Sequence, residues 1–334
     1  MTIKANLFSL PLLLILPVCL FFPALTQSAA AGEWRLAIAQ SVRHPALDDV
    51  ASGVKQYFHE NEIYPDFILV IADYSPVEDQ SPSQAVNKIS EFDPDLVVTI
   101  GTQASQQIIR HINNVPVIFT AVTDPLGAGI VNDPRKPGGL VTGLTDMSPV
   151  EAQLDMIVRV QPGIKNLGMV FSQFEQNAVM IRNSLDKSAG NFGITLVESP
   201  VGRGENVADR ALDILESIEA LYISTDNYVV SSVEQLARLC AAARIPLYAA
   251  DPSSVAGGAM AALSIDYFRM GRQTGAMSRR VLEGADPALM AVERPREMTI
   301  TINTGAALAM GIDLPMDLIM AADVIHSFFP DEHP

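Results

Sequence analysis

Cysteine and basic residues are scarce in this chain, and both shortages limit what it can do. The 334 residues include two cysteines, one tryptophan and five histidines, and 22 lysines and arginines stand against 38 acidic residues, for a formal net charge of -16 at pH 7. A surface this acidic repels phosphate groups, so we expect no nucleic-acid partner. Two cysteines are also too few for a zinc cluster built from cysteines.

Sequence motifs of several enzyme classes are absent as well. The chain contains no GxxxxGK[ST] phosphate loop, no GxGxxG after the first apolar run and no GxSxG nucleophile elbow, and its histidines form no HExxH or i, i+4 pair. Hydride transfer, nucleotide hydrolysis, serine hydrolysis and zinc chemistry therefore lose their usual sequence support. We expect neither a cofactor nor a metal ion.

Residues 1–31 differ in kind from the rest of the chain. Lys4 is their single charged residue, residues 7–25 are almost wholly apolar, and the small-residue run QSAAAG follows at 27–32. This layout is typical of a secretory signal peptide. It predicts export to the periplasm, with cleavage near Ala29 to Ala31.

Two kinds of membrane attachment are alternatives for the same segment. The apolar run approaches the length that a bilayer requires, but three prolines interrupt it. Cys19 would permit lipid anchoring, but Val18 stands where a small residue is expected before a lipidated cysteine. We therefore expect cleavage without a lipid anchor, which leaves Cys240 alone and excludes an internal disulfide. Cys240 itself is predicted to be a buried helix residue.

Short apolar runs alternate with segments of helical spacing along the rest of the chain. The runs predicted as strands cover residues 34–40, 67–72, 96–100, 116–121, 167–171, 194–198, 220–224, 246–250, 260–265 and 298–302. Strands that are apolar throughout and alternate with helices belong to parallel sheets covered on both faces. The sequence therefore predicts an α/β protein, and its length favours two cores rather than one.

One βαβ pattern occurs twice, about 120 residues apart. LVVTIGTQAS, a helix to about His111 and VPVIFTAVTDP are repeated as ALYISTDNYV, a helix to about Ala243 and IPLYAADPSS. Any two βαβ units share a general pattern, but here the threonine of the first turn and the Asp-Pro of the second also match. The repeat predicts two similar Rossmann-like lobes.

Segments rich in glycine and proline mark the predicted connections between the lobes. RKPGGLVTGLTDMSP (135–149) is the predicted boundary, and 255–271, which contains a Gly-Gly pair, is a second connection. The tail 316–334 ends in acidic and proline residues and is predicted to be a surface appendage.

Candidate ligand-binding residues follow the predicted strands, because the carboxyl ends of parallel strands bring polar turns and helix N-termini together. Thr102 follows one strand, and Thr225, Asp226 and Asn227 occupy the equivalent turn of the second repeat. Such residues can donate to or accept from a ligand, but helix capping explains them equally well.

Other candidates lie in the remaining turns. Asp124 and Asp251 precede prolines, where a carboxylate can bind a ligand ammonium group or simply begin a turn. Phe174 is an aromatic residue in a polar turn and is predicted to contact the ligand. Ser41 and His44 follow the first strand, but a single histidine is more often a turn or surface residue. The predicted ligand-binding residues are Ser41, Thr102, Gln103, Ala104, Thr123 and Asp124 in the first lobe and Phe174, Gln176, Thr225, Asp226, Asn227 and Asp251 in the second.

Several segments occur in an order that points to a known family. RHPALDD, GTQAS, FTAVTDPLGAGIV, GGLVTGLTDMSPVEAQLDMI, STDNYVVSSVEQL and SIDYFRMGRQTGAM follow one another between about residues 34 and 315. This chain resembles the ABC-transporter substrate-binding proteins that include streptococcal tryptophan-binding lipoproteins. SQFE (172–175) and STDN (224–227) stand where family members often carry NPSE and PTDN, so the resemblance does not specify an aromatic amino acid.

The resemblance implies a type I periplasmic-binding-protein fold with three crossovers between its lobes. Its first lobe would comprise residues 32–145 plus about 267–296, and its second 146–266 plus about 297–330. The implied function is that of the exported solute-binding component of an ABC importer. The expected ligand is a small polar or zwitterionic solute, and amino acids are among the candidates. The expected macromolecular partner is the ABC permease and ATPase complex. The protein is expected to be a monomer.

Two other functions remain open at this point. A periplasmic sensor of the same fold would present its liganded form to a membrane receptor. A cleft enzyme would use carboxylates such as Asp226 and Asp251 for acid–base work, which requires perturbed pKa values. We expect no enzyme activity.

Overall fold

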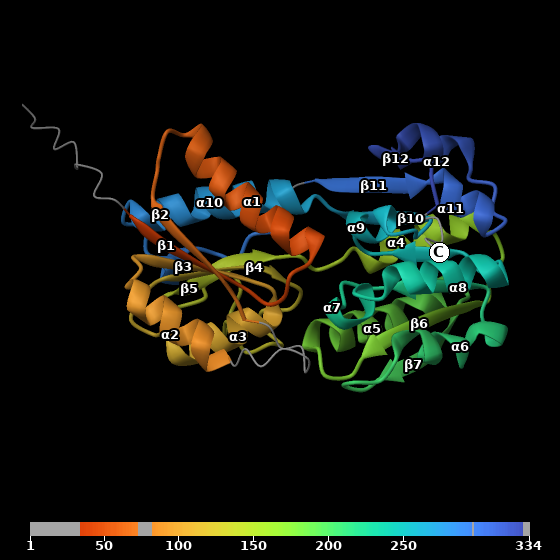
Figure 1. The fold of residues 1–334 in the computed structure, drawn as a ribbon, viewed down its shortest axis with the longest axis horizontal. Coiled ribbons are helices and arrows are strands. Elements are labelled where there is room, and N and C mark those ends of the chain that lie inside the picture. The colour runs from red at the N-terminus through yellow and green to blue at the C-terminus, as the bar shows by residue number, and fades with distance from the viewer. Residues whose placement is uncertain (1–33, 73–81, 296, 330–334) are drawn as a thin grey trace, which may run out of the picture. The chain divides into compact units, whose positions relative to one another are not determined.

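The first lobe is built around a five-stranded sheet in the order β2-β1-β3-β4-β5, in which all strands are parallel (Figure 1). The computed structural model describes residues 34–72, 82–295 and 297–329, so the predicted signal peptide and Cys19 lie outside the described residues. The strands are β1 (Arg35–Gln40), β2 (Asp66–Ile71), β3 (Leu96–Ile100), β4 (Val117–Val122) and β5 (Val141–Thr145).

Four helices cover the two faces of this sheet: α1 (Pro45–Glu60), α2 (Pro82–Phe92), α3 (Thr102–His111) and α10 (Tyr267–Leu282). Leu36 and Ile38 of β1 are buried in the core with α1 and α10, whereas Ala37 and Ala39 are buried in the core with α2 and α3. Side chains therefore alternate between two covered faces, as the apolar runs predicted.

The contact between α1 and α10 depends on glycine. A Cβ atom at Gly53 would lie 2.1 Å from the carbonyl oxygen of Phe268, and one at Gly271 would lie 2.2 Å from that of Val50. Only residues without a side chain permit this approach. Helix α10 follows a strand of the other sheet along the chain, so this packing returns the chain to the first lobe.

The second lobe contains a seven-stranded sheet in the order β12-β11-β10-β9-β8-β6-β7. The strands are β6 (Asn166–Ser172), β7 (Thr195–Val201), β8 (Ala220–Ile223), β9 (Leu247–Ala249), β10 (Ala261–Ile265), β11 (Met298–Asn303) and β12 (Val324–His326). The five strands from β6 to β10 are parallel and repeat the strand order of the first sheet, whereas β11 runs antiparallel to β10.

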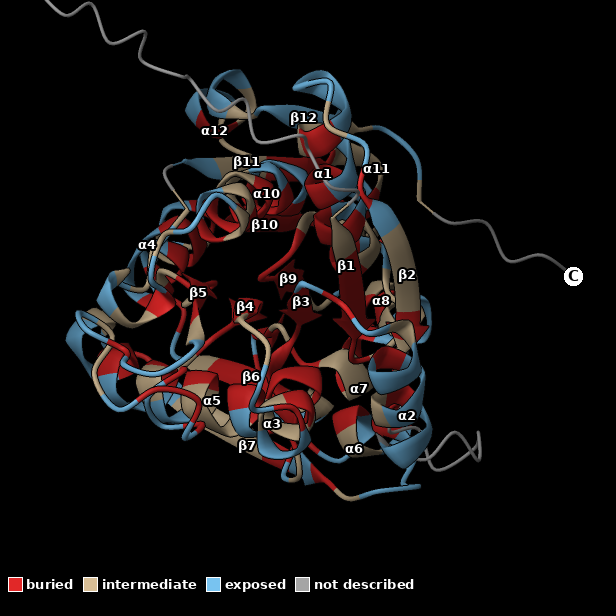
Figure 2. Cartoon of the chain, turned by 90° about the vertical axis from the view of Figure 1, so that its left-hand side faces the viewer, coloured by how far each residue is buried: buried red, intermediate tan, exposed pale blue. Residues whose placement is uncertain are grey.

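The helices of the second lobe cover this sheet, whose central strands β6, β8, β9 and β10 are mostly buried (Figure 2). They are α4 (Val150–Val160), α5 (Gln176–Ala189), α6 (Val207–Leu212), α7 (Asn227–Val230), α8 (Val233–Ala243), α9 (Pro252–Ala256), α11 (Thr304–Ala309) and α12 (Met316–Ala321). Short 3-10 helices cover Gly190–Phe192, Leu215–Ser217 and Pro287–Leu289. Both repeated units are present, as β3-α3-β4 and as β8-α7-α8-β9. The helix expected up to Ala243 is interrupted after Val230.

Two further local expectations need correction. Segment 135–149, interpreted as a boundary, contains β5, whose glycine, Gly143, packs against the backbone of Phe119 on β4. The tail expected to be a surface appendage contributes β12, which pairs with β11, while residues 330–334 lie outside the described residues. Both strands are short, and tertiary pairing rather than local sequence stabilises them.

The chain passes between the two sheets three times: after β5, after β10 and before β11. The predicted lobe boundaries at these points stay predictions, because residue contacts group Glu33–Pro334 into one compact unit. Within the described part of the chain, no helix combines the length and apolar character needed to cross a membrane.

Candidate ligand-binding site

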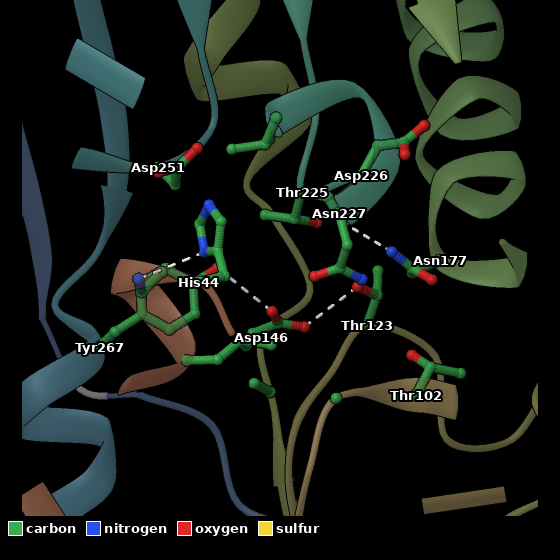
Figure 3. Close-up of a pocket in the computed structure, with 15 residues that line it drawn as sticks. His44, Thr102, Thr123, Asp146, Asn177, Thr225, Asp226, Asn227, Asp251 and Tyr267 are labelled. Atoms are coloured by element: carbon green, nitrogen blue, oxygen red, sulfur yellow. Dashed lines mark hydrogen bonds between the residues drawn. The ribbon is translucent and has the colours of Figure 1, made fainter. Parts of the chain in front are cut away.

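A pocket lies where the carboxyl ends of strands from both sheets meet, as expected for parallel α/β lobes. Its empty volume, including the solvent at its open mouth, is about 420 Å³. Figure 3 shows its polar residues, which are His44, Thr102, Thr123, Asp146, Asn177, Thr225, Asp226, Asn227, Asp251 and Tyr267.

Half of the predicted ligand-binding residues line this pocket. They are Thr102 and Thr123 from the first lobe and Thr225, Asp226, Asn227 and Asp251 from the second. The other half, which are Ser41, Gln103, Ala104, Asp124, Phe174 and Gln176, do not belong to the lining. Ligand contact stays a prediction for all of them.

Several of the remaining candidates stabilise the polypeptide around the pocket. The hydroxyl of Ser41 accepts a hydrogen bond from the Ala104 N–H at 3.0 Å and donates to the Ile100 carbonyl, which joins the end of β1 to the start of α3. Asp124 accepts from the Gly127 N–H at 2.9 Å. Phe174 packs edge-on against Tyr228, with a centroid distance of 5.2 Å.

Gln176 joins the two lobes at the first residue of α5. Its Nε2 donates to the Gly127 carbonyl in the loop after β4 at 2.5 Å, and its Oε1 accepts from Gln106 Nε2 of α3 at 3.0 Å. Gln106 also donates to the Ala128 carbonyl. The prediction had assigned Gln176 to ligand contact; here it binds the opposite lobe.

Asp146, which directly follows β5, is a buried carboxyl group in the wall of the first lobe. Its Oδ1 accepts from Thr123 Oγ1 at 3.0 Å and its Oδ2 from the Tyr267 hydroxyl at 3.2 Å (Figure 3). Burial raises the pKa of Asp146 to about 6, and the hydrogen bonds from Thr123 and Tyr267 oppose this rise. Each carboxylate oxygen has capacity for a second donor.

The two other acidic residues of the lining make more bonds within the protein. Asp226 caps α7, accepting from the backbone N–H groups of Tyr228 and Val229 and from the backbone and hydroxyl of Ser172. Asp251 caps α9 and accepts from the backbone N–H and hydroxyl of Ser254 and from the hydroxyl of Ser253. Helix capping, the alternative stated for Asp226, is therefore observed.

Glu175 lies behind the second-lobe wall and is almost completely buried. Its carboxylate accepts from the backbone of Asn227 and Tyr228 and from the side-chain amides of Asn177 and Asn227. Burial, and then the nearby Asp226, raise the pKa of Glu175 to about 7, while burial also raises the pKa of Asp226.

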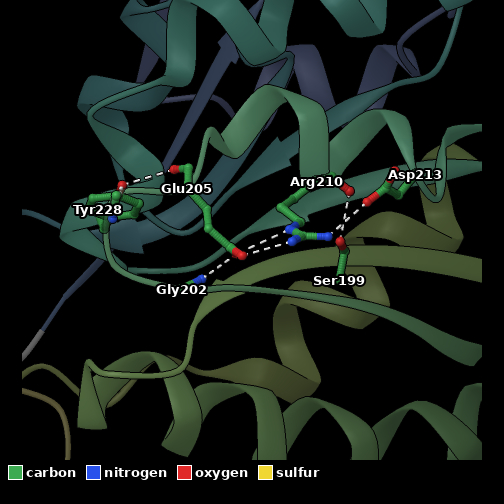
Figure 4. Close-up of polar contacts among 7 residues, drawn as sticks. Ser199, Gly202, Glu205, Arg210, Asp213 and Tyr228 are labelled. Atoms are coloured by element: carbon green, nitrogen blue, oxygen red, sulfur yellow. Dashed lines mark hydrogen bonds and ion pairs between the residues drawn. The ribbon is translucent and has the colours of Figure 1, made fainter.

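The short helix α7 is also fixed from the outer side of the lobe. The Tyr228 hydroxyl donates to the Glu205 carbonyl at 2.9 Å, and the Glu205 carboxylate is held by Arg210 through Nε at 3.1 Å and Nη2 at 2.8 Å (Figure 4). A two-point Arg–carboxylate contact is geometrically specific. The contact between Arg210 and Glu205 holds in place the loop that contains Glu205, to whose carbonyl the Tyr228 hydroxyl is bonded.

The pocket is acidic and has little basic character. None of the described residues that line it is a lysine or arginine. His44 caps α1, and burial lowers its pKa, although Asp251, Asp48 and Asp49 act in the opposite direction. In the described part of the chain, no cluster of three or more His, Cys, Asp or Glu side chains has the arrangement of a metal site. Cys240 is buried, as predicted, and burial raises the pKa of its thiol to about 12.

Asp146, Asn177 and Tyr267 line the pocket although the sequence did not single them out. Asp146 and Tyr267 follow β5 and β10, so the strand-end rule applied to the other turns would have found them. Asp146 was missed because its strand was interpreted as a boundary. Asn177 lies one residue beyond Gln176, in the first turn of α5.

Two lobes of parallel sheet, three connections and a polar pocket at the strand ends define a type I periplasmic-binding-protein-like fold. This chain belongs to the ABC transporter substrate binding protein family, whose sequence profile matches residues 35–325. The resemblance found in the sequence and the predicted α/β architecture are both confirmed.

Individual relatives agree with this family. A tyrosine-binding protein of Clostridioides difficile is 29% identical over 300 residues, which cover 89% of this chain and 85% of the relative. A conserved domain protein of Vibrio cholerae has a TM-score of 0.82 and 31% identity, and covers 88% of this chain and all of its own. An ABC domain of Streptococcus pneumoniae in complex with L-Trp has a TM-score of 0.79 and 27% identity over 87% of this chain and 99% of its own.

Proposed function

We propose that this protein is the exported solute-binding component of an ABC importer and that it binds an amino acid between its two lobes. The family supports solute binding in an ABC system. Two similar proteins are named or described with an aromatic amino acid, tyrosine in one case and L-Trp in the other. The N-terminal signal-peptide pattern supports export.

The observation that carries the proposal is the position of Asp146. This buried carboxyl group lines a pocket that has no lysine or arginine in its described lining, and each of its oxygens accepts one hydrogen bond. A buried carboxylate without a cationic partner is costly unless a ligand supplies the charge. An ammonium group has the charge and the three donors to do so.

The opposite end of an amino acid fits a different part of the pocket. Thr102 and Gly101, which line the pocket, begin α3. The N-terminus of a helix carries partial positive charge and N–H groups that bind a carboxylate. Asp146 for the ammonium group and the start of α3 for the carboxylate together would select a zwitterion.

A thermal-shift screen of the mature protein tests this assignment. The panel contains amino acids, short peptides, sugars, nucleosides and polyamines. A ligand at 100 times its Kd adds about 2.7 kcal/mol to the free energy of unfolding, which raises the Tm by several degrees in lobes of this size. We expect at least one amino acid to give such a shift. Hits confined to sugars or nucleosides would contradict an amino-acid ligand.

A second experiment addresses export and partnership. The mature protein recovered from its host should begin near residues 30–32, as determined by mass spectrometry, and should stimulate ATP hydrolysis by its cognate permease and ATPase only when loaded with ligand. An unprocessed N-terminus would contradict cleavage of the signal peptide. Stimulation of a sensor receptor instead of a permease would contradict the proposed role in an ABC importer.

A further inference from the structure

The side-chain amides of Asn177 and Asn227 in the second-lobe wall have their orientations set by one buried residue. Asn177 Nδ2 lies 2.7 Å from the Thr225 carbonyl oxygen and 3.3 Å from Glu175 Oε2. A carbonyl oxygen can only accept, so the atom of Asn177 that faces it must be the nitrogen. Asn227 Nδ2 likewise donates to Glu175 Oε2 at 2.7 Å.

This arrangement decides which atoms remain for a ligand. Asn177 Nδ2 donates to two acceptors within the protein, so the free hydrogen-bonding atom of this side chain is its oxygen. Asn227 Nδ2 donates to Glu175 through one of its two N–H groups, which leaves its oxygen as the acceptor of that side chain. Oδ1 of Asn177 is buried and has no partner. Figure 3 shows the Asn227 side chain extending towards Thr123 and Asp146, across the pocket. The hydroxyl of Thr225, in the same wall, is also buried without a partner.

We propose that Glu175 is a positioning residue that orients Asn177 and Asn227 so that the second-lobe wall offers hydrogen-bond acceptors, and that the ligand therefore presents its amine end to this wall. The inference rests on the proposed function, since it assigns the orientation of an amino acid in the same pocket. A carboxylate or phosphate placed there would meet amide oxygens and the nearby Asp146 and would be repelled.

Glu175 accepts from neutral N–H groups, while burial and the nearby Asp226 raise its pKa to about 7. The Tyr228 N–H donates both to Glu175 Oε1 at 3.0 Å and to Asp226 Oδ1 at 3.1 Å, so these two carboxyl groups face the same donor. Arg210 is paired with Glu205 and Asp213, and Arg203 lies over the ring of Phe174. The asparagine groups that donate to Glu175 are neutral amides, and a single substitution at Glu175 can disturb both hydrogen bonds.

The first test compares affinities. Glu175→Gln keeps the shape but removes the charge and one of the two acceptor oxygens. Asn177 and Asn227, which both donate to Oε2, are then held by a weaker acceptor. The probes are L-tyrosine and 3-(4-hydroxyphenyl)propionate, the same molecule without its ammonium group. If the screen identifies another amino acid, that amino acid and its deamino analogue are used. By calorimetry we expect about tenfold weaker binding of the amino acid and an equal fall in its preference over the deamino analogue.

Glu219→Gln is the matched control. Glu219 also accepts two backbone N–H groups in the second lobe, from Lys165 at 2.5 Å and Asn166 at 2.9 Å, at the amino end of β6 and away from the pocket. This substitution should leave both affinities within twofold of wild type. Equal affinities and equal preference in wild type and Glu175→Gln would overturn the proposal.

The second test needs no ligand and so separates this inference from the proposed function. In protein labelled with ¹⁵N at asparagine, the side-chain amide signals of Asn177 and Asn227 should exchange with solvent far more slowly than that of exposed Asn183. The same two signals should shift in Glu175→Gln but not in Glu219→Gln. Fast exchange in wild type overturns the positioning role even if the variant fails to fold. Slow exchange with no amino-acid binding in the screen would reject the proposed function and keep the positioning role.

Discussion

Asp146 is the residue whose surroundings most directly determine what the pocket attracts. It is buried, it accepts from two hydroxyl groups, and no basic side chain among the described lining residues offsets its charge. Burial favours its protonated form, while the two hydrogen bonds favour the ionised form. A ligand ammonium group would shift this balance towards the carboxylate.

Replacing Asp146 by asparagine should weaken amino-acid binding. Asp146→Asn keeps the size of the side chain but removes the charge, and one of the two hydroxyl groups, of Thr123 or Tyr267, must then accept from the new amide instead of donating. Hydrogen bonds to charged groups contribute about 1.5–3 kcal/mol, so we expect affinity to fall at least tenfold by calorimetry. Asp124→Asn, in the neighbouring turn but outside the pocket lining, is the control and should bind within twofold of wild type. Comparable losses in both variants would remove the special role of Asp146.

The affinity should also depend on pH in a defined direction. The pKa of Asp146 is raised to about 6 in the folded, ligand-free protein, so below pH 6 the group is increasingly protonated and no longer attracts a cation. We expect Kd to be constant above pH 8 and to rise about tenfold per pH unit below pH 6. Asp146→Asn should lose this steep rise and keep only the smaller change that comes from Glu175, whose pKa is raised to about 7. A wild-type Kd that is constant from pH 5 to 8 would show that the ligand does not bind the ionised carboxylate.

At the scale of elements, the N-terminus of α5 is where the two lobes exchange direct hydrogen bonds. Gln176 bonds to the loop after β4 and to α3, and α5 also carries Asn177 into the pocket wall. One turn of helix therefore contributes both to the ligand site and to the contact that holds the lobes together.

Removing the cross-lobe amide should shorten the lifetime of the complex. Gln176→Ala loses two hydrogen bonds of about 0.5–1.5 kcal/mol each. We expect ligand dissociation, followed by stopped-flow measurements, to become several-fold faster while the pH profile of binding stays unchanged. Gln107→Ala, at a half-buried position on α3 outside the pocket lining, should dissociate like wild type. An altered pH profile in Gln176→Ala would instead indicate that Gln176 touches the ligand itself.

At the scale of the whole molecule, each lobe supplies part of one pocket, so ligand binding energy favours the form in which the lobes are closed. Asp146, Thr102 and Thr123 come from one lobe, and Thr225 and Asn227 from the other. Three connections join the lobes, and we expect closure to occur as a hinge motion about them.

Closure should be visible in solution. We expect saturating ligand to reduce the radius of gyration measured by small-angle X-ray scattering of the mature protein. The ligand should have a smaller effect on Gln176→Ala at the same concentration, because its closed state lacks the cross-lobe bonds. An unchanged radius of gyration with tightly bound ligand would contradict a hinge-closing mechanism.

Much of the fold followed from local pattern. Apolar runs such as Leu96–Ile100 and Val117–Val122 became parallel strands because helices cover both of their faces. The repeated turns placed Thr102, Thr123, Thr225 and Asp251 at strand ends, where the pocket lies. Strands β5 and β12 were missed because their short sequences carry a weak local signal and depend on pairing with β4 and β11.

The sequence by itself determined the α/β class, the duplicated lobes, the acidic character of the protein and the family, because periodicity, turn residues and charge are local or additive properties. Only the tertiary structure decided which polar residues line the pocket and which bond to other parts of the protein. Asp146 and Asn177 enter the pocket, Gln176 turns to the opposite lobe, and Glu175 is buried behind two asparagines. The physical reason is that a side chain's role depends on the donors, acceptors and solvent around it, which segments far apart in the chain supply.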